Sequence, residues 1–256
     1  MNLLALQVRI IATLVLRETR ATFGTSQIGY LWAVLTPSIS VGLLAFIFSL
    51  IDRQAPFGGS LPVFFATGIL TIEFFNKLSN ALMASFSANK ALLTYPLIKE
   101  TDTLYARTVL ISATYLVIMI VFYSALIAVG AGLLPARPEL VLQAFAAIAF
   151  LGFGFGTLNA VIVSAWDSWQ HIEKVLTRPL LFISGVFYVP SRLPREATDI
   201  LYWNPVIHLV EWMREGFYAN YNSTIFDPRY PIFVGLILLL LGLAGERFTR
   251  KSRSLA

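Results

Sequence analysis

The stretch LVLQAFAAIAFLGFGFGTLNAVIVSA, residues Leu140–Ala165, carries no charged side chain and is apolar on all faces of a helix. A bilayer core is crossed by about 20 apolar residues in helical form, whereas a barrel strand alternates polarity over about 10 residues. The stretch therefore predicts a membrane-spanning helix. Of the 256 residues in the chain, 57% are hydrophobic and only 13% are charged, against about 25% charged in an ordinary soluble domain. We predict an all-α membrane protein.

Six transmembrane helices are predicted from the gaps between charges. Besides Leu140–Ala165, four spans lie in runs that are free or nearly free of charge: Leu31–Ile51, a segment that starts near Leu61, Tyr105–Val129 and Tyr230–Gly245. The remaining span is weak, because only a short uncharged run separates Arg178 from Arg192. The next apolar stretch, Ile200–Val210, is interrupted by Pro205. Such pieces are typical of re-entrant or interfacial helices, so we predict a broken region before the last span.

An even number of spans places both termini on one side of the membrane. The N-terminal segment carries Arg9, Arg17 and Arg20, and the C-terminal tail is also rich in arginine and lysine. Because an excess of positive charge stays in the cytoplasm, we predict cytoplasmic termini and an external segment at Ser191–Tyr230. The net charge of +5 is explained by this topology, so it does not indicate a nucleic-acid partner.

Residues 3–22 are predicted to form an amphipathic helix that lies in the membrane interface. Arg9, Thr13, Arg17 and Arg20 are spaced by about one helical turn, which places them on one stripe of the helix. A signal peptide would instead carry its positive charge before an uninterrupted apolar stretch. A plain surface anchor and a role in recognition are both compatible with this pattern.

The motifs exclude several kinds of catalytic and binding site. There is no GxxxxGK[ST] loop for ATP, no cysteine, and no metal-ligand spacing around the two histidines. The GFGFG run at Gly152–Gly156 lies inside a predicted span, so its small residues indicate close helix packing rather than a dinucleotide-binding loop. Glu73 and Lys77 form an intramembrane i,i+4 pair, which is either a functional charge site or a self-paired couple near the cytoplasmic end.

Aromatic side chains, which make up 14% of the chain, have more than one interpretation. Rings at the ends of spans are typical of interface belts, and rings within spans commonly pack in the core. Rings along a transport path can also stack on the apolar faces of sugars. The candidates for such a path are Tyr30, Trp32, Phe46, Phe48, Phe182, Phe187 and Tyr188.

Two stretches resemble a known family. The first is LRETRATFGTSQIGYLWAVLTPS (Leu16–Ser38); the second is SGVFYVPSRLP (Ser184–Pro194) followed by LYWNPVIHLVEWMREGF (Leu201–Phe217). Together they resemble the transmembrane subunit of ABC-2-type capsular polysaccharide exporters, whose relatives include the O-antigen and teichoic-acid permeases. The resemblance extends over nearly the whole chain and implies one transmembrane domain, residues 1–256, with the fold of an ABC-2 exporter.

The resemblance implies a transport subunit rather than an enzyme. Such a permease works as a homodimer in the lipid of the bacterial inner membrane and docks two ATPase subunits. Those subunits bind ATP and Mg, so no cofactor is expected in this chain. The substrate would be a lipid-linked, acidic capsular polysaccharide, which is passed to a periplasmic adaptor and an outer-membrane export channel. The ATPase would contact a coupling loop at residues 85–102, through Phe86, Asn89, Lys90, Tyr95, Lys99 and Glu100.

The resemblance also implies roles at both ends of the path. Arg17, Arg20 and Arg107 would attract the acidic polymer near the entrance. Re-entrant helices in residues 184–218 would gate the outer mouth, with the following gate residues: Asn204, Pro205, His208, Glu211 and Arg214. The spacing of the last three also fits a plain structural row on one helix face. Two alternatives stay open: an O-antigen or teichoic-acid permease, and a secondary carrier that uses Glu73 and Lys77.

Overall fold

The structure is a computed structural model that describes residues 3–24, 27–51, 54–93 and 98–253. This part of the chain forms helices joined by turns and contains no strand, which confirms the all-α prediction. The helices are α1 (Leu3–Phe23), α2 (Gln27–Leu50), α3 (Leu61–Met83), α4 (Ser85–Ala88), α5 (Glu100–Ala128), α6 (Pro138–Ala165), α7 (Trp169–Thr177), α8 (Leu180–Ile183), the 3₁₀ helix η1 (Pro190–Arg192), α9 (Arg195–Leu201), α10 (Pro205–Phe217) and α11 (Arg229–Arg253).

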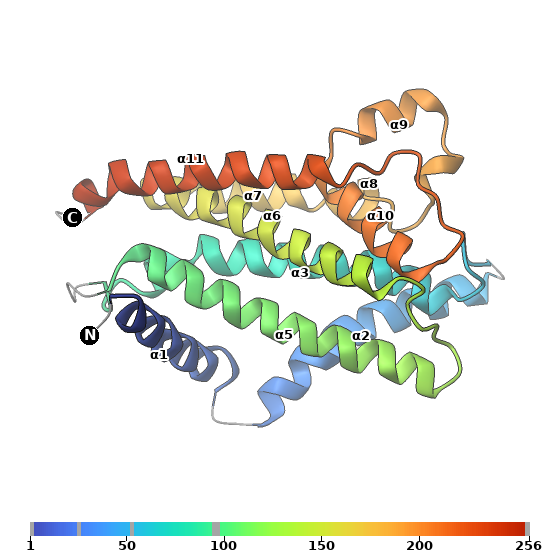
Figure 1. Cartoon of the computed structure of the whole chain (residues 1–256), viewed down its shortest axis with the longest axis horizontal. Helices are drawn as coiled ribbons and strands as arrows, with labels where there is room; N and C mark the ends of the chain where they lie inside the picture. Colours follow the sequence, from blue (N-terminus) through green and yellow to red (C-terminus); the bar gives the residue numbers. More distant parts are fainter. Residues whose placement is uncertain (1–2, 25–26, 52–53, 94–97, 254–256) are drawn as a thin grey trace.

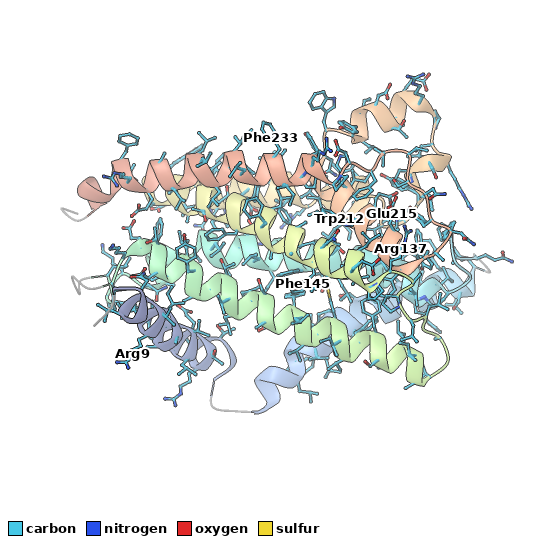
Figure 2. The ribbon with its side chains drawn as sticks, in the orientation of Figure 1. Arg9, Arg137, Phe145, Trp212, Glu215 and Phe233 are labelled. Atoms are coloured by element: carbon cyan, nitrogen blue, oxygen red, sulfur yellow. The ribbon has the colours of Figure 1, made fainter. Side chains whose placement is uncertain are left out.

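In the described residues, four helices are long and apolar enough to cross a membrane: α3, α5, α6 and α11 as far as Thr249. They pack as a bundle in which α6 contacts both α3 and α11, and α5 contacts α3 (Figure 1). Phe64 and Phe74 of α3 are fully buried in this bundle. On the outer face of α11, Phe233 points away from the other helices and is 61% exposed (Figure 2). The bundle therefore presents apolar side chains both to its own core and to its surroundings.

The glycines of α6 let its two neighbours approach closely. A Cβ atom built on Gly154 would lie 2.3 Å from the carbonyl oxygen of Gly235 in α11. A Cβ atom built on Gly156 would lie 2.7 Å from the Cβ atom of Leu82 in α3. Both distances are too short for a real side chain, so only glycine fits at these two places. The GFGFG run is a two-sided packing surface, which confirms the prediction of close helix packing.

One of the predicted spans differs from the expectation. Helix α2 covers all but the last residue of the predicted span Leu31–Ile51 as one helix that contains Pro37, and its apolar part includes Val34–Leu50. The fifth predicted span is divided into α7 and the four-residue α8, after which Gly185 turns the chain with a φ of 77°. Pro179 and Pro190 lack the N–H group that would continue a helix, which explains the division. In the described residues, four of the six predicted spans are present as helices that meet the length and hydropathy of a membrane span.

The start of α5 also differs, because the predicted span began at Tyr105 and the helix begins at Glu100. The backbone N–H of Lys99 donates to the Asp102 carboxylate at 2.9 Å, which satisfies one of the donors left open at the beginning of the helix. Polar residues of the predicted coupling loop thus form the first turn of α5. The loop between α3 and α5 is correspondingly shorter than predicted.

The two ends of the molecule are built from different parts of the chain (Figure 1). We use the name terminal end for the end that holds α1, α4, the beginning of α5 and the C-terminal part of α11. The opposite end, called the far end, holds α10 and the short helix α9, which projects beyond the start of α11. The helix predicted for residues 3–22 is present as α1 and lies against α5.

Candidate functional site

At the terminal end, a largely buried ion pair fixes α1 to the bundle. The Glu18 carboxylate of α1 lies 3.3 Å from the Arg107 guanidinium of α5. Arg107 also donates to the carbonyl of Ala81 in α3 at 2.6 Å. Closer to the start of α1, Gln7 donates to the Asp102 carboxylate of α5. Helices α1, α3 and α5 are therefore joined through Arg107.

Asn89, the residue that follows α4, connects the predicted coupling loop to α1. Its side-chain oxygen accepts a hydrogen bond from Arg17 at 2.6 Å, and its amide nitrogen donates to Glu18 at 3.0 Å. The same amide donates to the carbonyl of Ser85 at the start of α4 at 3.0 Å. A movement of α4 must therefore carry α1 with it or break these hydrogen bonds.

The residues predicted to contact an ATPase divide into two groups. Buried inside this chain are Phe86, Asn89 and Glu100. Exposed are Lys90 and Lys99, whereas Tyr95 lies outside the described residues. Phe86 belongs to the hydrophobic core and Asn89 is hydrogen-bonded to α1, so these side chains already make contacts within this chain. Lys90 and Lys99 are the candidates for a direct contact.

Two of the three arginines predicted to attract polymer have another role in the structure. The charge of Arg107 is already paired with Glu18, and Arg17 donates to Asn89. Arg107 is largely buried, whereas Arg17 is exposed beside Asn89, and the attraction of polymer by these side chains stays a prediction. Arg20 is exposed near the end of α1 and is compatible with the predicted role.

At the far end, a fully buried arginine connects three segments. The Arg214 guanidinium of α10 lies 3.2 Å from the Glu211 carboxylate. It donates to the carbonyls of Tyr188 and Val186 at 3.2 Å and 3.3 Å. Its Cζ atom lies 3.9 Å from the centroid of the Phe64 ring in α3, a cation–π contact. Arg214 therefore holds the turn that follows α8 against both α10 and α3.

Glu211 completes this buried network. Its carboxylate oxygens each lie 2.9 Å from the hydroxyl of Tyr221, which follows α10. Burial raises the pKa of Glu211, while the positive charge of Arg214 and the hydrogen bonds oppose that shift. Burial also raises the pKa of the neighbouring Tyr218 to about 12, so this hydroxyl stays protonated. Removal of one partner of such a pair leaves the other charge buried and uncompensated.

The beginning of α10 is fixed by Asn204 and Pro205, two of the predicted gate residues. The side-chain oxygen of Asn204 accepts from the N–H of Val206 at 3.0 Å, and its amide donates to the hydroxyl of Ser184 at 2.9 Å. Pro205 occupies the first position of the helix, where no N–H donor is needed. The cap therefore joins α10 to the end of α8.

The neutral imidazole of His208 links α10 to two further segments. Its Nδ1 atom accepts from the backbone N–H of Asp227 at 3.1 Å. Nε2 must then carry the proton, which it donates to the carbonyl of Tyr202 at 2.8 Å. Burial lowers the pKa of His208, whereas the carbonyl of Tyr202 and the charge of Asp227 act in the opposite direction. The predicted gate residues thus form the structural core of the far end.

The aromatic residues predicted to line a path are only partly brought together. The ring of Phe48 in α2 lies 6.2 Å from that of Phe187, which lies 5.7 Å from that of Phe182. Tyr188 is half-buried, and its carbonyl accepts from Arg214. Away from this cluster, Trp32 and Phe46 are exposed on α2, and the side chain of Tyr30 lies outside the described residues. A ring cluster therefore lies between α2 and the segment after α8.

A cavity of about 490 Å³ with a mixed polar and apolar lining lies between α2, α3 and α5. Its polar lining on α3 consists of Glu73, Asn76, Lys77 and Asn80. In the residues that the structure describes, Glu73 and Lys77 form no ion pair within 4.0 Å. The hydroxyl of Ser40 on α2 donates to the carbonyl of Thr36. Glu73 and Lys77 therefore form no close ion pair in this structure, and both interpretations of the pair stay predictions.

Several residues of these networks are absent from the sequence-based candidates. Glu18 could be found from sequence as an acidic residue between two arginines, Arg17 and Arg20, of a basic helix. Tyr221 and Asp227 lie in the irregular segment between α10 and α11, where no periodic pattern places them near α10. Their contacts with Glu211 and His208 come from tertiary packing alone.

Comparisons with known proteins agree with the resemblance. The profile of the family described as ABC-2 type transporter matches residues 9–218. The polysialic acid transport protein KpsM of Escherichia coli is 30% identical over 238 residues, covering 91% of each chain. The capsule polysaccharide export inner-membrane proteins CtrC of Neisseria meningitidis serogroup B and BexB of Haemophilus influenzae are each 28% identical, covering 94% of this chain and 91% of theirs. An O-antigen export permease of Klebsiella pneumoniae is less similar, at 22% identity over 234 residues.

Proposed function

The chain belongs to the ABC-2 type transporter family, and from this membership we propose that it is the membrane-embedded permease of a capsular polysaccharide exporter. One observation carries the proposal: similarity to capsule polysaccharide export proteins extends over more than nine-tenths of the chain, 94% in two of the comparisons. The family match, residues 9–218, includes both the α1 junction at the terminal end and α10 at the far end. The chain is a transport subunit rather than an enzyme.

We propose six membrane crossings with both termini in the cytoplasm. Helices α3, α5, α6 and α11 make four of them, and α2 and the divided segment α7–α8 make the others. The arginine-rich segments near both termini support a cytoplasmic terminal end. The far end then faces the periplasm, and α9 and α10 are re-entrant or interfacial helices of the gate.

A second copy of the chain would complete the transport path. Helix α2 supports this, because its exposed side chains are large and apolar: Leu31, Ile39, Leu43, Phe46 and Leu50. An apolar face made of several large side chains is covered either by lipid or by another protein surface. In a homodimer, two copies of the ring cluster Phe48, Phe182 and Phe187 would border the path. Rings there would stack weakly on successive sugars, so that the polymer moves without being trapped.

The power for export would come from two separate ATPase subunits that bind ATP and Mg. They would dock at the terminal end, where Lys90 and Lys99 are exposed on either side of the loop between α4 and α5. Movement of α4 would reach α1 through the hydrogen bonds of Asn89. It would reach α3 and α5 through Arg107, which contacts Ala81 and Glu18. Rigid helices then carry the displacement to the far end.

At the far end, opening would require the segment after α8 to move relative to α10. Arg214 resists this movement, because its bonds to Val186 and Tyr188 hold the two segments together. The gate is therefore expected to move as one body with α10 rather than to unfold locally. The exported polymer would pass to a periplasmic adaptor and an outer-membrane channel.

Deletion of the gene for this chain in its own host tests the proposal. We expect the surface polysaccharide to disappear and polymer to accumulate inside the cell, with recovery on complementation by the intact gene. The control is a host that lacks the capsule glycosyltransferases, in which no polymer should accumulate. Loss of O-antigen or teichoic acid instead of capsule would assign the chain to that class of permease. Unchanged surface glycans of all three kinds would refute the proposal.

A further inference from the structure

A polar stripe runs along α3 inside one of the apolar spans. The stripe consists of Glu73 and of the residues three, four and seven positions after it, which are Asn76, Lys77 and Asn80. With these spacings all four lie on one face of the helix. All four line the cavity of about 490 Å³ between α2, α3 and α5. Counted from Leu61 at about 1.5 Å per residue, the stripe begins about 18 Å into the helix. At the same rise Asn80 lies about 28 Å from Leu61, so the stripe occupies the part of α3 nearer the terminal end.

The polar atoms of this cavity are not satisfied by the protein itself. The Oδ1 atom of Asn76 is buried and has no hydrogen-bond partner. Lys77 is exposed to the cavity, and among the described residues it has no carboxylate within 4.0 Å. An unpaired polar group or charge inside a membrane is unfavourable unless a polar molecule contacts it. The cavity therefore offers unsatisfied polar groups on α3 opposite apolar side chains such as Trp32 and Ile111, a combination that suits an amphipathic ligand.

The groups in the cavity match the chemistry of a sugar. Glu73 and Asn76 offer acceptors, Lys77 offers donors and a positive charge, and a sugar hydroxyl both donates and accepts. The exposed indole of Trp32 lies at the edge of the cavity and offers a flat apolar face. A volume of about 490 Å³ is within the range of small-molecule sites, about 300–1,000 Å³. A single metal ion would not fill it, and the described residues hold no cluster of metal ligands.

We infer that the cavity between α2, α3 and α5 binds a saccharide unit of the transported polymer, with Lys77 contacting a carboxylate or phosphate of an acidic sugar. This inference rests on the proposed function and assigns a substrate subsite that lies within one copy of the chain. Asn76 accepts from a sugar hydroxyl, and Trp32 covers the apolar face of the ring. The site lies apart from the ring cluster of Phe48, Phe182 and Phe187.

Photochemical cross-linking tests this subsite in the complete exporter. p-Benzoylphenylalanine replaces Trp32 at the cavity edge in one variant and Phe233 in a matched control. Both are exposed aromatic positions, but Phe233 is on α11 and points away from the bundle (Figure 2). The host cells are fed radiolabelled glucose, irradiated and extracted with organic solvent to remove lipid. We expect labelled polymer on the chain at position 32 and none at position 233.

Variants of Lys77 supply an independent measurement. Loss of a charge-assisted hydrogen bond, about 1.5–3 kcal/mol, predicts that Lys77→Met lowers the export rate by about tenfold or more, whereas Lys77→Arg retains most of it. Lys174→Met, which removes an exposed lysine outside the cavity, should export as the wild type does. Each variant is compared at equal amounts of protein in the membrane.

The possible outcomes separate the inference from the proposed function. Cross-linking from position 32 to a second copy of the chain would assign the cavity to the dimer interface. Cross-linking from position 32 to phospholipid would assign the cavity to lipid. Either result would overturn the saccharide subsite. Normal export by Lys77→Met would overturn it as well. Failure of the wild-type chain to export any polymer would refute the proposed function itself, whatever the variants do.

Discussion

Replacement of Arg214 by methionine is predicted to destabilise the far end strongly. Methionine retains the length of the side chain but removes the guanidinium. The Glu211 carboxylate then stays buried with only the Tyr221 hydroxyl beside it, and the carbonyls of Val186 and Tyr188 lose their donor. Breaking a buried ion pair in this way costs about 3–5 kcal/mol. For a chain of this size we expect the midpoint of thermal unfolding to fall by about 6–20 °C.

This effect is measured with a double-mutant cycle in detergent-purified protein. Tryptophan fluorescence reports unfolding during heating. Glu211→Gln alone should also lower the midpoint, because Arg214 then keeps an uncompensated buried charge. The midpoint of the double variant should fall by less than the sum of the decreases in the two single variants, because neither buried charge remains. The control, Arg195→Met, removes an exposed arginine of α9 and should change stability by less than about 0.5 kcal/mol.

Two results would refute the reasoning about Arg214. A midpoint of Arg214→Met as high as that of Arg195→Met would mean that the buried contacts contribute nothing to stability. Additive losses in the cycle would mean that Arg214 and Glu211 act independently. Arg214→Lys distinguishes charge from geometry, because it keeps the positive charge but cannot reach all three acceptors.

Three further predictions concern other parts of the fold. Gly154→Ala should lower stability by about 1–3 kcal/mol, because the new methyl group meets the backbone of α11; Gly42→Ala, which enters open space in α2, should be neutral or slightly stabilising in the same melting assay. Arg107→Met should release α1 from the bundle, seen as faster hydrogen exchange or proteolysis in α1 but not in α11, and equal protection would contradict the docking role. Because the pKa of His208 is lowered in the fold, its contribution to stability is present above the unfolded pKa of about 6.5 and is lost as the pH falls through the folded value. The His208→Gln variant should therefore be less sensitive to acid than the wild type, and an unchanged acid dependence would argue against this.

The long spans can be predicted from the sequence because each depends on local composition. A charge-free run such as Leu140–Ala165 can satisfy its backbone only as a helix in lipid, whatever it packs against. The same holds for the GFGFG run, since small residues inside a span have few uses other than close packing. Local composition is also why the helix at residues 3–22 is predicted to within a residue of its observed end.

The division of the fifth span and the contacts of the predicted site depend on more than composition. The pattern of Pro179, Gly185 and Pro190 indicates a break but does not specify where the chain turns. The role of Arg107 could not be predicted, because its partner Glu18 lies in another helix and no local spacing relates the two. Charge alone suggested that Arg107 attracts polymer, whereas packing shows it bound to Glu18 and Ala81.

The candidate gate illustrates the same difference between local and tertiary information. The cap formed by Asn204 and Pro205 is a local motif and appears where the sequence places it. The functions of His208 and Glu211 as buried acceptors depend on Asp227 and Tyr221, which approach only when the segment before α11 folds back on α10. The sequence pattern identifies the residues, and the tertiary structure identifies their partners.

ATP-dependent movement of polymer in proteoliposomes tests directly whether the chain is the permease of an ATP-driven exporter. The vesicles contain the chain together with the ATPase subunit that co-purifies with it, and they are supplied with radiolabelled polymer from the host. We expect that polymer becomes protected inside inverted vesicles only when ATP and Mg are present, and that a proton gradient without ATP has no effect. Transport driven by the proton gradient in the absence of ATP would contradict the account and would identify a secondary carrier.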